Sequence, residues 1–156
     1  LRLSRIALHA RTGKQQYKGH PDLEAFQGFY ELCQHPLYYN GGIESLSDIR
    51  QILTRFPLLK GVFIGRGLLS SPLLAKEFKG NETFLPEQRM SIYFAFHEEL
   101  FSAYSQVLQG ETQLLVKMKT LWEYFLPETD RKLLKRIKKS TRLQQYTESV
   151  KAIFTS

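Results

Sequence analysis

Three short apolar runs in the first half of the chain constrain its fold more than any other feature of the sequence. They cover residues 6–8, 37–39 and 62–64, and each has the length of a strand and ends at a polar residue or a glycine. Two longer segments with helical patterns, residues 21–34 and 45–56, lie between the runs. Strands separated by helices pair in parallel, because the crossover has to travel back over the sheet. The first half therefore predicts a β-α-β-α-β-α unit with a parallel sheet.

Three parallel strands are too few to bury both faces of a sheet, so this unit is expected to belong to a larger α/β fold. In a (β/α)₈ barrel the carboxyl ends of the strands form the active site, and the loops after the last two strands commonly bind phosphate. The polar and glycine residues of this chain fall at those ends. We therefore expect residues 1–80 to be the C-terminal portion of a TIM barrel, with about three β/α units.

The strand signals stop after Gly80, and apolar residues then recur at helical spacing. This pattern predicts four helices, at residues 86–108, 111–125, 129–139 and 142–154. Thr129 suits the N-cap of the third helix. We expect an all-α bundle over residues 86–156, separated from the α/β region by a hinge near residues 79–86.

The composition is that of a globular chain, with 42% hydrophobic and 24% charged residues. No apolar run approaches the roughly 20 residues of a membrane span, so we expect a cytoplasmic protein without a membrane partner. The single cysteine, Cys33, excludes an internal disulfide and a cysteine-built zinc site, and no metal site is expected. Its helical surroundings predict a buried structural thiol. Nothing in the sequence indicates an obligate protein partner.

Basic residues outnumber acidic ones by 22 to 15, and most of the excess lies between residues 117 and 142. Four of these basic residues are spaced i, i+3, i+4, i+7 and so form one helical stripe: Lys132, Lys135, Arg136 and Lys139. Such a stripe is often only a solvated helix face. Because few acidic residues are interleaved, and because Lys117 and Lys119 extend the positive region, we favour contact with an RNA backbone. The nearby Trp122, Tyr124 and Phe125 are expected to lie mainly in the core.

Two glycine loops follow consecutive strands, Asn40-Gly41-Gly42-Ile43 and Gly65-Arg66-Gly67. Each loop alone is consistent with a tight strand-to-helix turn. On neighbouring parallel strands, however, their N–H groups and the arginine would meet at one edge and could share a phosphate. His9 ends the preceding strand at the same edge, which favours ligand contact over a purely structural role. Arg11 lies two residues after His9. We expect it either to reach a phosphate or an acidic side chain, or to be a solvated surface residue.

The order of these motifs resembles the tRNA-dihydrouridine synthases over nearly the whole chain. The motifs that carry the resemblance are His9-Ala10-Arg11-Thr12, Tyr17-Lys18-Gly19, Asn40-Gly41-Gly42-Ile43, Ile64-Gly65-Arg66-Gly67 and Lys117-Met118-Lys119 with Leu121-Trp122. The resemblance implies reduction of the C5–C6 double bond of a uridine in tRNA by hydride from FMN, with NADPH as the reductant of the flavin. It also implies that the FMN phosphate is held by Asn40, Gly41, Gly42, Gly65 and Arg66, with Gly67 beside them. His9 would contact the flavin, Arg11 would lie on the tRNA side, and the helical domain would grip the tRNA backbone.

The sequence departs from this family in one respect that matters for activity. The family's proton-donating cysteine lies in an asparagine-glycine-cysteine-proline-like loop, and no segment of these 156 residues matches it. We therefore assign no catalytic residue here and expect the chain alone to be inactive. Two alternatives stay open: another FMN-dependent TIM-barrel oxidoreductase that acts on a small molecule, and a non-catalytic RNA-binding module.

Overall fold

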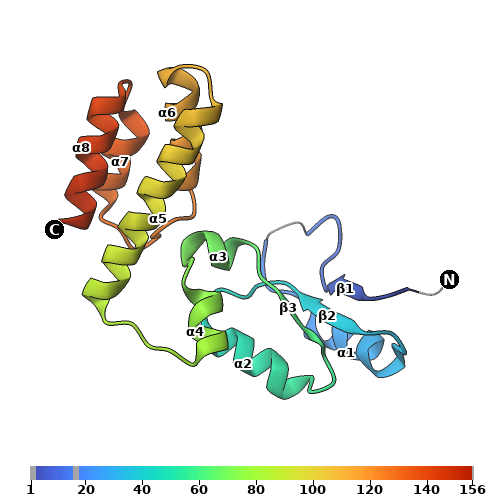
Figure 1. Cartoon of the computed structure of the whole chain (residues 1–156). Helices are drawn as coiled ribbons and strands as arrows, with labels where there is room; N and C mark the ends of the chain where they lie inside the picture. The colour runs from blue at the N-terminus through green and yellow to red at the C-terminus, as the bar shows by residue number, and fades with distance from the viewer. Residues whose placement is uncertain (1–2, 16–17, 156) are drawn as a thin grey trace. The chain divides into compact units, whose positions relative to one another are not determined.

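The computed structural model describes residues 3–15 and 18–155, so Tyr17 of the second motif lies outside the described residues. The chain forms two compact units, residues 1–68 and 69–156. Figure 1 shows strands only in the first unit, whereas the second is built from helices. The predicted combination of an α/β region followed by a helical region is confirmed.

The first unit is a parallel sheet of three strands in the order β1-β2-β3. The strands are β1 (Ile6–His9), β2 (Leu37–Asn40) and β3 (Gly61–Phe63), and the helices between them are α1 (Leu23–Leu32) and α2 (Leu46–Arg55). In the register of the sheet, His9 lies opposite Asn40, and Asn40 lies opposite Phe63. The sequence predicted this order of elements, and the helices are one to two residues shorter at each end than expected.

Both crossover helices begin where side chains satisfy their first N–H groups. Asp22 accepts hydrogen bonds from the N–H groups of Glu24 and Ala25 at 3.1 and 2.9 Å, which starts α1. Ser45 and Asp48 form a capping box at the start of α2, each accepting from the other's backbone N–H. The sequence alone therefore determines where these two helices start.

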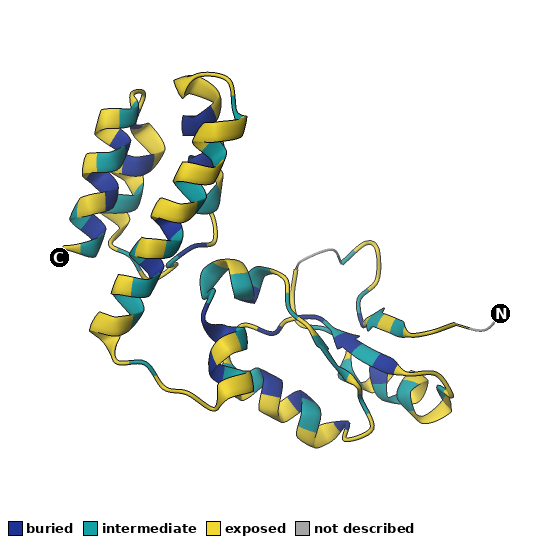
Figure 2. Ribbon diagram, viewed as in Figure 1, coloured by how far each residue is buried: buried dark blue, intermediate teal, exposed yellow. Residues whose placement is uncertain are grey.

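The two faces of the sheet differ in how well they are covered. On one face Phe26 of α1 packs edge-on against Tyr39 of β2 and against Phe56, with ring centroids 4.9 Å apart in both pairs. Side chains alternate between the faces of a strand. The residues that point to the other face, such as Ala7, His9 and Phe63, are exposed within the described part of the chain (Figure 2).

The second unit contains a longer run of helices than predicted. They are α4 (Leu74–Gly80), α5 (Pro86–Val107), α6 (Glu111–Leu121), α7 (Arg131–Lys139) and α8 (Leu143–Phe154), and α3 (Arg66–Ser70) spans the division between the units. Helix α6 ends four residues earlier than expected, because the N–H groups of Trp122, Glu123 and Tyr124 donate to carbonyls three residues back and no longer continue the α-helical pattern. The N-cap of α7 is Asp130 and not Thr129, since the Asp130 carboxylate accepts from the N–H groups of Lys132 and Leu133.

The division between Leu68 and Leu69 lies ahead of the hinge expected at residues 79–86. The reason is that α4 is tied to α5 within the second unit. The buried Glu77 of α4 forms an ion pair with Arg89 of α5, and Leu73 packs in the helical core. The segment that joins α4 to α5 is thus held at both ends by the same unit.

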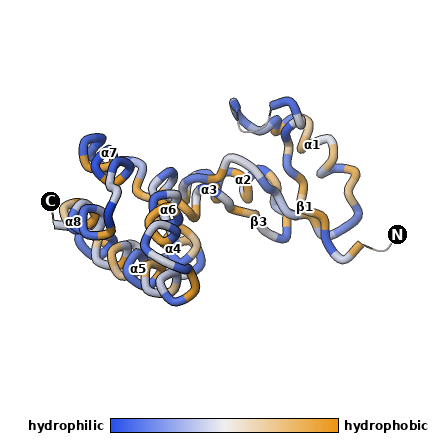
Figure 3. The backbone as a smooth tube through the Cα atoms, turned by 90° about the horizontal axis from the view of Figure 1, so that it is seen from above, coloured by the Kyte–Doolittle hydropathy of each residue, from blue (hydrophilic) through white to orange (hydrophobic). Residues whose placement is uncertain are grey.

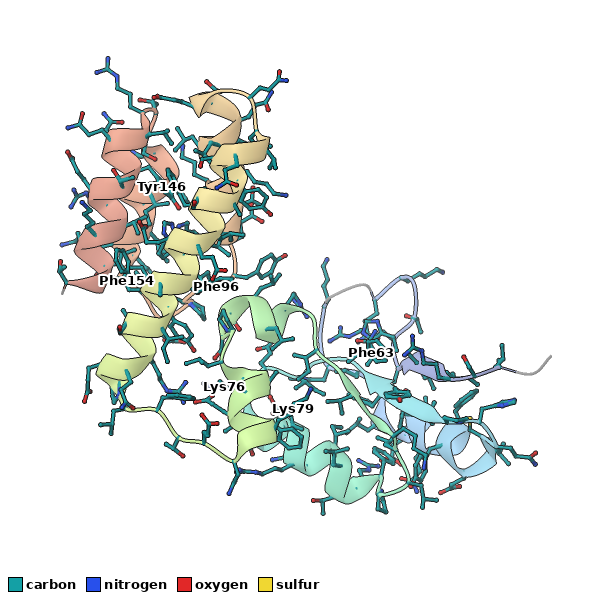
Figure 4. All side chains as sticks on the ribbon, viewed as in Figure 1. Phe63, Lys76, Lys79, Phe96, Tyr146 and Phe154 are labelled. Carbon is teal, nitrogen blue, oxygen red and sulfur yellow. The ribbon has the colours of Figure 1, made fainter. Side chains whose placement is uncertain are left out.

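The core of the second unit is closed around buried aromatic and aliphatic side chains. Trp122 and Phe125 are almost fully buried, as predicted, whereas Tyr124 is 40% exposed and does not belong to the core. The three residues follow α6 in successive turns, so their side chains point in different directions. Tyr146 of α8, labelled in Figure 4, lies fully buried among these helices.

A hydrogen-bonded chain of polar groups runs through this core. The indole N–H of Trp122 donates to the Tyr146 hydroxyl at 3.0 Å, and that hydroxyl lies 2.7 Å from Nε2 of His97. Because the Glu98 carboxylate can only accept, the neutral His97 ring carries its proton on Nδ1, and Nε2 then accepts from the Tyr146 hydroxyl. Nδ1 then donates to the Glu98 carboxylate at 3.0 Å. Burial lowers the pKa of His97, although the contact with Glu98 opposes this.

Cys33 differs from its prediction because α1 ends one residue before it. The cysteine is the C-cap of α1 and is half-buried, and its Sγ donates to the carbonyl of His35 at 3.6 Å.

Within residues 3–15 and 18–155, no helix is both long and apolar enough to cross a membrane. The same residues contain no group of three or more histidine, cysteine, aspartate and glutamate side chains arranged to hold a metal ion.

Candidate functional site

A pocket of about 260 Å³ lies at the carboxyl ends of the three strands. It brings together six of the seven residues predicted to bind a cofactor: His9, Asn40, Gly41, Gly42, Gly65 and Arg66. The register explains why they meet, because His9, Asn40 and Phe63 form one row across the sheet and the glycine loops leave from that row. Gly67 is the one predicted residue that does not line the pocket.

The pocket also has three lining residues that sequence reasoning missed, Ile43, Glu44 and Phe63. Phe63, labelled in Figure 4, is 43% exposed and packs edge-on against Tyr38 at a centroid distance of 5.6 Å. A signal for it existed, because Phe63 occupies the strand position that points away from the helices. Glu44 directly follows the first glycine loop and places an acidic residue at the rim, which opposes anion binding.

Three of the loop glycines are required by the backbone itself. Gly41 and Gly42 have φ values of +147° and +60°, a region that favours glycine, and a Cβ on Gly41 would lie 3.0 Å from Pro21 and 3.1 Å from the His9 ring. A Cβ on Gly67 would overlap the carbonyl oxygen of Ile43. Gly67 therefore lets the loop after β3 pack against the loop after β2.

Gly65 is different, because the protein itself does not require a glycine there. Its φ is not positive, and a Cβ at this position would meet open space. The residue is exposed and lines the pocket. A glycine at such a place leaves the backbone bare, which suits the close approach of a ligand.

Backbone N–H groups are available at the pocket. Within the described residues, the N–H groups of Gly42, Ile43 and Gly65 donate to no other part of the chain. The next two N–H groups, of Glu44 and Ser45, are taken by the Asp48 carboxylate at 2.9 and 2.8 Å. The start of α2 is thus already capped, and any anion would bind the glycine loops themselves.

These features fit a phosphate group. Unpaired backbone N–H groups, a bare glycine and the guanidinium of Arg66 are the donors that phosphate oxygens accept from. The volume of about 260 Å³ is below the roughly 300–1,000 Å³ of pockets that enclose a drug-sized ligand. The pocket formed by the described residues is therefore large enough for a phosphate group and small for a whole cofactor.

Arg11 lies beside the pocket but is engaged by its own loop. Its guanidinium donates to the carbonyls of Lys18 and Gly19 at 2.9 and 2.7 Å. Burial raises the pKa of Tyr39, the nearby Arg11 charge opposes that rise, and Asp48 adds to it. The predicted tRNA contact of Arg11 stays a prediction, and its observed role is to hold the loop together.

The basic stripe of the second unit lines a groove. All four stripe residues are exposed on α7, and they border a groove of about 420 Å³ together with residues of α8, among them Gln145 and Glu148. Much of α7 is hydrophilic along its outer side (Figure 3), while Ile137 on its other side is fully buried. The predicted amphipathic helix is confirmed, and its four cations line one groove, which also contains the acidic Glu148.

Lys117 and Lys119 do not line this groove. Lys117 is exposed, with its Nζ 5.3 Å from the ring centre of Tyr104. The ammonium of Lys119 donates to the carbonyl of Ser140, the C-cap of α7, and so stabilises that helix end. An RNA contact by either lysine stays a prediction, and Lys119 has a structural partner.

The chain matches a known protein family over nearly its whole length. A family model described as Dihydrouridine synthase (Dus) matches residues 3–155. The chain belongs to the dihydrouridine synthase family. For a dihydrouridine synthase, three parallel strands that alternate with helices are consistent with part of the family's TIM barrel.

Two curated relatives of this dihydrouridine synthase chain carry the name probable tRNA-dihydrouridine synthase. The protein from Aquifex aeolicus (strain VF5) is 34% identical over 77 residues, which are 49% of this chain and 24% of that protein. The protein from Rhizobium leguminosarum bv. phaseoli is 36% identical over 67 residues, or 43% of this chain and 21% of that protein. The matching part of the chain thus covers less than a quarter of each relative.

Proposed function

We propose that this chain carries the FMN-phosphate subsite and an RNA-binding helical unit of a tRNA-dihydrouridine synthase, an enzyme that reduces the C5–C6 double bond of a uridine in tRNA. The observation that supports this most strongly is the pocket in which two glycine loops from consecutive strands meet His9. When bound, FMN supplies hydride to the uridine and is itself reduced by NADPH.

The residues of the pocket divide the work of holding the phosphate. The N–H groups of Gly42, Ile43 and Gly65 donate to phosphate oxygens, and Arg66 adds charge-assisted hydrogen bonds. Asn40 and Gly41 form the turn after β2. Gly67 has no side chain and so allows the two loops to pack closely. His9 lies at the end of β1 on the uncovered face of the sheet and lines the pocket, where it would contact the flavin.

The groove along α7 supplies the RNA contact. Its four cations repeat along one helix face over about 10 Å, since the rise of an α-helix is about 1.5 Å per residue. That length suits contacts with successive backbone phosphates. Among the residues that the structure describes, no aromatic side chain lines the groove, so recognition there rests on the backbone charge and not on stacked bases.

Cys33 takes no part in this chemistry. It follows α1 and precedes β2, so it lies at the amino end of the sheet, whereas the pocket lies at the carboxyl end. No other cysteine is present in the chain. We therefore expect the proton donor of the reaction to come from outside these 156 residues.

The phosphate subsite is tested by comparing FMN with riboflavin, which lacks the phosphate, in equilibrium dialysis with the chain. We expect FMN to bind more tightly, and Gly65→Ala to weaken FMN binding by about tenfold, equivalent to ~1.4 kcal/mol. Gly28→Ala is the matched control, because a Cβ at Gly28 on α1 also meets open space. Equal binding of FMN and riboflavin would contradict the proposal.

The activity is tested with the full-length gene product, incubated with tRNA transcript and NADPH and followed by mass spectrometry for uridines that have gained two hydrogens. A protein that binds FMN but leaves the tRNA unchanged and reduces a small molecule would support the small-molecule alternative. Tight, salt-sensitive tRNA binding without any flavin would support the RNA-binding module. The α7 groove favours an RNA substrate over a small molecule, because a small-molecule enzyme has no use for it.

A further inference from the structure

We propose that Glu44 restricts the phosphate subsite to ligands that end in a single phosphate, so that the site takes a mononucleotide such as FMN and excludes a dinucleotide such as FAD. The inference rests on the proposed function, since it takes the pocket as a phosphate site. It gives a role to the one acidic side chain among the described residues that line the pocket. Without such a role, this carboxylate would only weaken the binding of an anion.

The two ends of the pocket differ in what they offer a ligand. At one end, a Cβ on Gly41 would lie 3.1 Å from the ring of His9, and Phe63 ends β3 in the same row across the sheet. Both rings are exposed on the uncovered face and suit the flavin. At the other end, the Cα of Glu44 lies 3.1 Å from the place that a Cβ on Gly67 would take. A ligand with its flavin at the strand ends therefore turns the far side of its phosphate toward Glu44.

The start of α2, just beyond Glu44, has no room for a second anion. The N–H groups of Glu44 and Ser45 already donate to the Asp48 carboxylate at 2.9 and 2.8 Å. That carboxylate occupies the position at a helix N-terminus where an anion would otherwise be stabilised. Arg66 is the one lysine or arginine among the described lining residues, and the proposed subsite uses it for the first phosphate. A second phosphate would therefore meet negative charge without a cation of its own.

The charge of Glu44 is available to act on a ligand. The side chain is exposed, and no described cation forms an ion pair with its carboxylate. The charge of FMN ends at the first phosphate, whereas a dinucleotide brings a second phosphate closer to the carboxylate. The repulsion therefore raises the dissociation constant of the dinucleotide more than that of FMN. Glu44 touches none of the reacting atoms, and its role is in ligand specificity.

The test compares FMN with FAD in equilibrium dialysis with the full chain. We expect the unaltered chain to prefer FMN, and Glu44→Gln to reduce that preference by about threefold to tenfold at low salt, chiefly through tighter binding of FAD. The change should shrink at high salt, because salt screens exposed charges. Glu31→Gln is the matched control, since it removes an exposed carboxylate from α1 of the same unit. A Glu44→Gln variant with the same preference as this control would overturn the inference.

A second measurement separates charge from the bulk of the adenosine in FAD. Inorganic phosphate and pyrophosphate, which both lack adenosine, are tested as competitors of FMN. We expect Glu44→Gln to improve competition by pyrophosphate more than competition by phosphate. If the two anions respond equally to the substitution, the carboxylate does not act on a second phosphate and the inference is overturned.

Riboflavin distinguishes failure of the inference from failure of the proposed function. Equal binding of FMN and riboflavin to the unaltered chain would remove the phosphate subsite, and the inference with it. Preference for FMN over riboflavin, combined with an FMN-to-FAD preference that Glu44→Gln does not change, would overturn the inference alone.

Discussion

The two units of this chain bury their side chains to different extents. The helical unit closes a core around Met118, Phe125 and Ile137, and its buried polar groups are hydrogen-bonded. The α/β unit covers one face of its sheet and leaves Ala7, His9 and Phe63 exposed on the other. The exposed face carries the proposed phosphate subsite, while the four cations of the α7 stripe lie on the exposed surface of the closed unit. The proposed phosphate subsite needs a sheet face that stays uncovered. The cationic stripe needs only a stable helix, which a closed core provides.

The largest effect that separates the two units is expected from neutralising the α7 stripe. Changing Lys132, Lys135, Arg136 and Lys139 to glutamine should lower tRNA affinity at least a hundredfold at low salt, with the salt slope reduced by roughly three. FMN binding should stay unchanged, because these residues lie in the other unit. Filter binding and dialysis measure the two properties. Equal loss of both would show that the units do not divide the functions.

Tyr146→Phe is expected to destabilise the helical unit by about 2–4 kcal/mol, because the Trp122 N–H and the His97 ring are left buried without their partner. Urea unfolding, followed by Trp122 fluorescence, measures this change. Tyr124→Phe is the control, since Tyr124 is 40% exposed and should change stability little. A small effect of Tyr146→Phe would mean that the buried chain of hydrogen bonds contributes little to the closed core.

Gly67→Ala should destabilise the α/β unit by about 1–3 kcal/mol, because the added Cβ overlaps the carbonyl of Ile43. Gly65→Ala should leave stability nearly unchanged and act on FMN binding instead. Hydrogen exchange of the β2 and β3 amides reports the first effect. The opposite pattern, with Gly65→Ala destabilising and Gly67→Ala neutral, would contradict the distinction between packing and ligand glycines.

The smallest effect is a pH dependence confined to the helical unit. The folded pKa of His97 is below its usual 6.5, so below pH 6.5 the unfolded state binds more protons and stability falls as pH decreases. The loss should reach about 1.4 kcal/mol per pH unit until the folded pKa is passed. Above pH 6.5 this histidine should contribute no slope. Urea midpoints between pH 5 and 8 measure it, and His97→Asn should flatten the curve.

Much of the architecture could be predicted because local rules decide it. The strands follow from three apolar runs, and the starts of α1 and α2 follow from Asp22 and from the Ser45–Asp48 pair. The meeting of the glycine loops with His9 also followed from the sequence, since parallel strands place their carboxyl ends at one edge. The amphipathic stripe of α7 was readable from its spacing alone.

Other features depend on contacts between residues far apart in the chain. Glu77 and Arg89 attach α4 to the helical unit. That unit therefore begins at Leu69, ahead of the hinge expected at residues 79–86. Lys119 and Arg11 read as surface cations, but the carbonyls of Ser140, Lys18 and Gly19 engage them. The sequence does not reveal which backbone carbonyls at a helix end or in a loop lack a backbone partner and can accept from a distant side chain.

The sequence by itself determined the α/β and helical halves, the family and the edge of the sheet where an anion would bind, because periodicity, capping and glycine placement act within a few residues. Only the tertiary structure decided which glycines serve packing and which one leaves room for a ligand. It also decided which cations are free to meet a polyanion. Those assignments depend on whether a neighbouring backbone atom already occupies the space or accepts the hydrogen bond, and that is known only once distant segments are folded together.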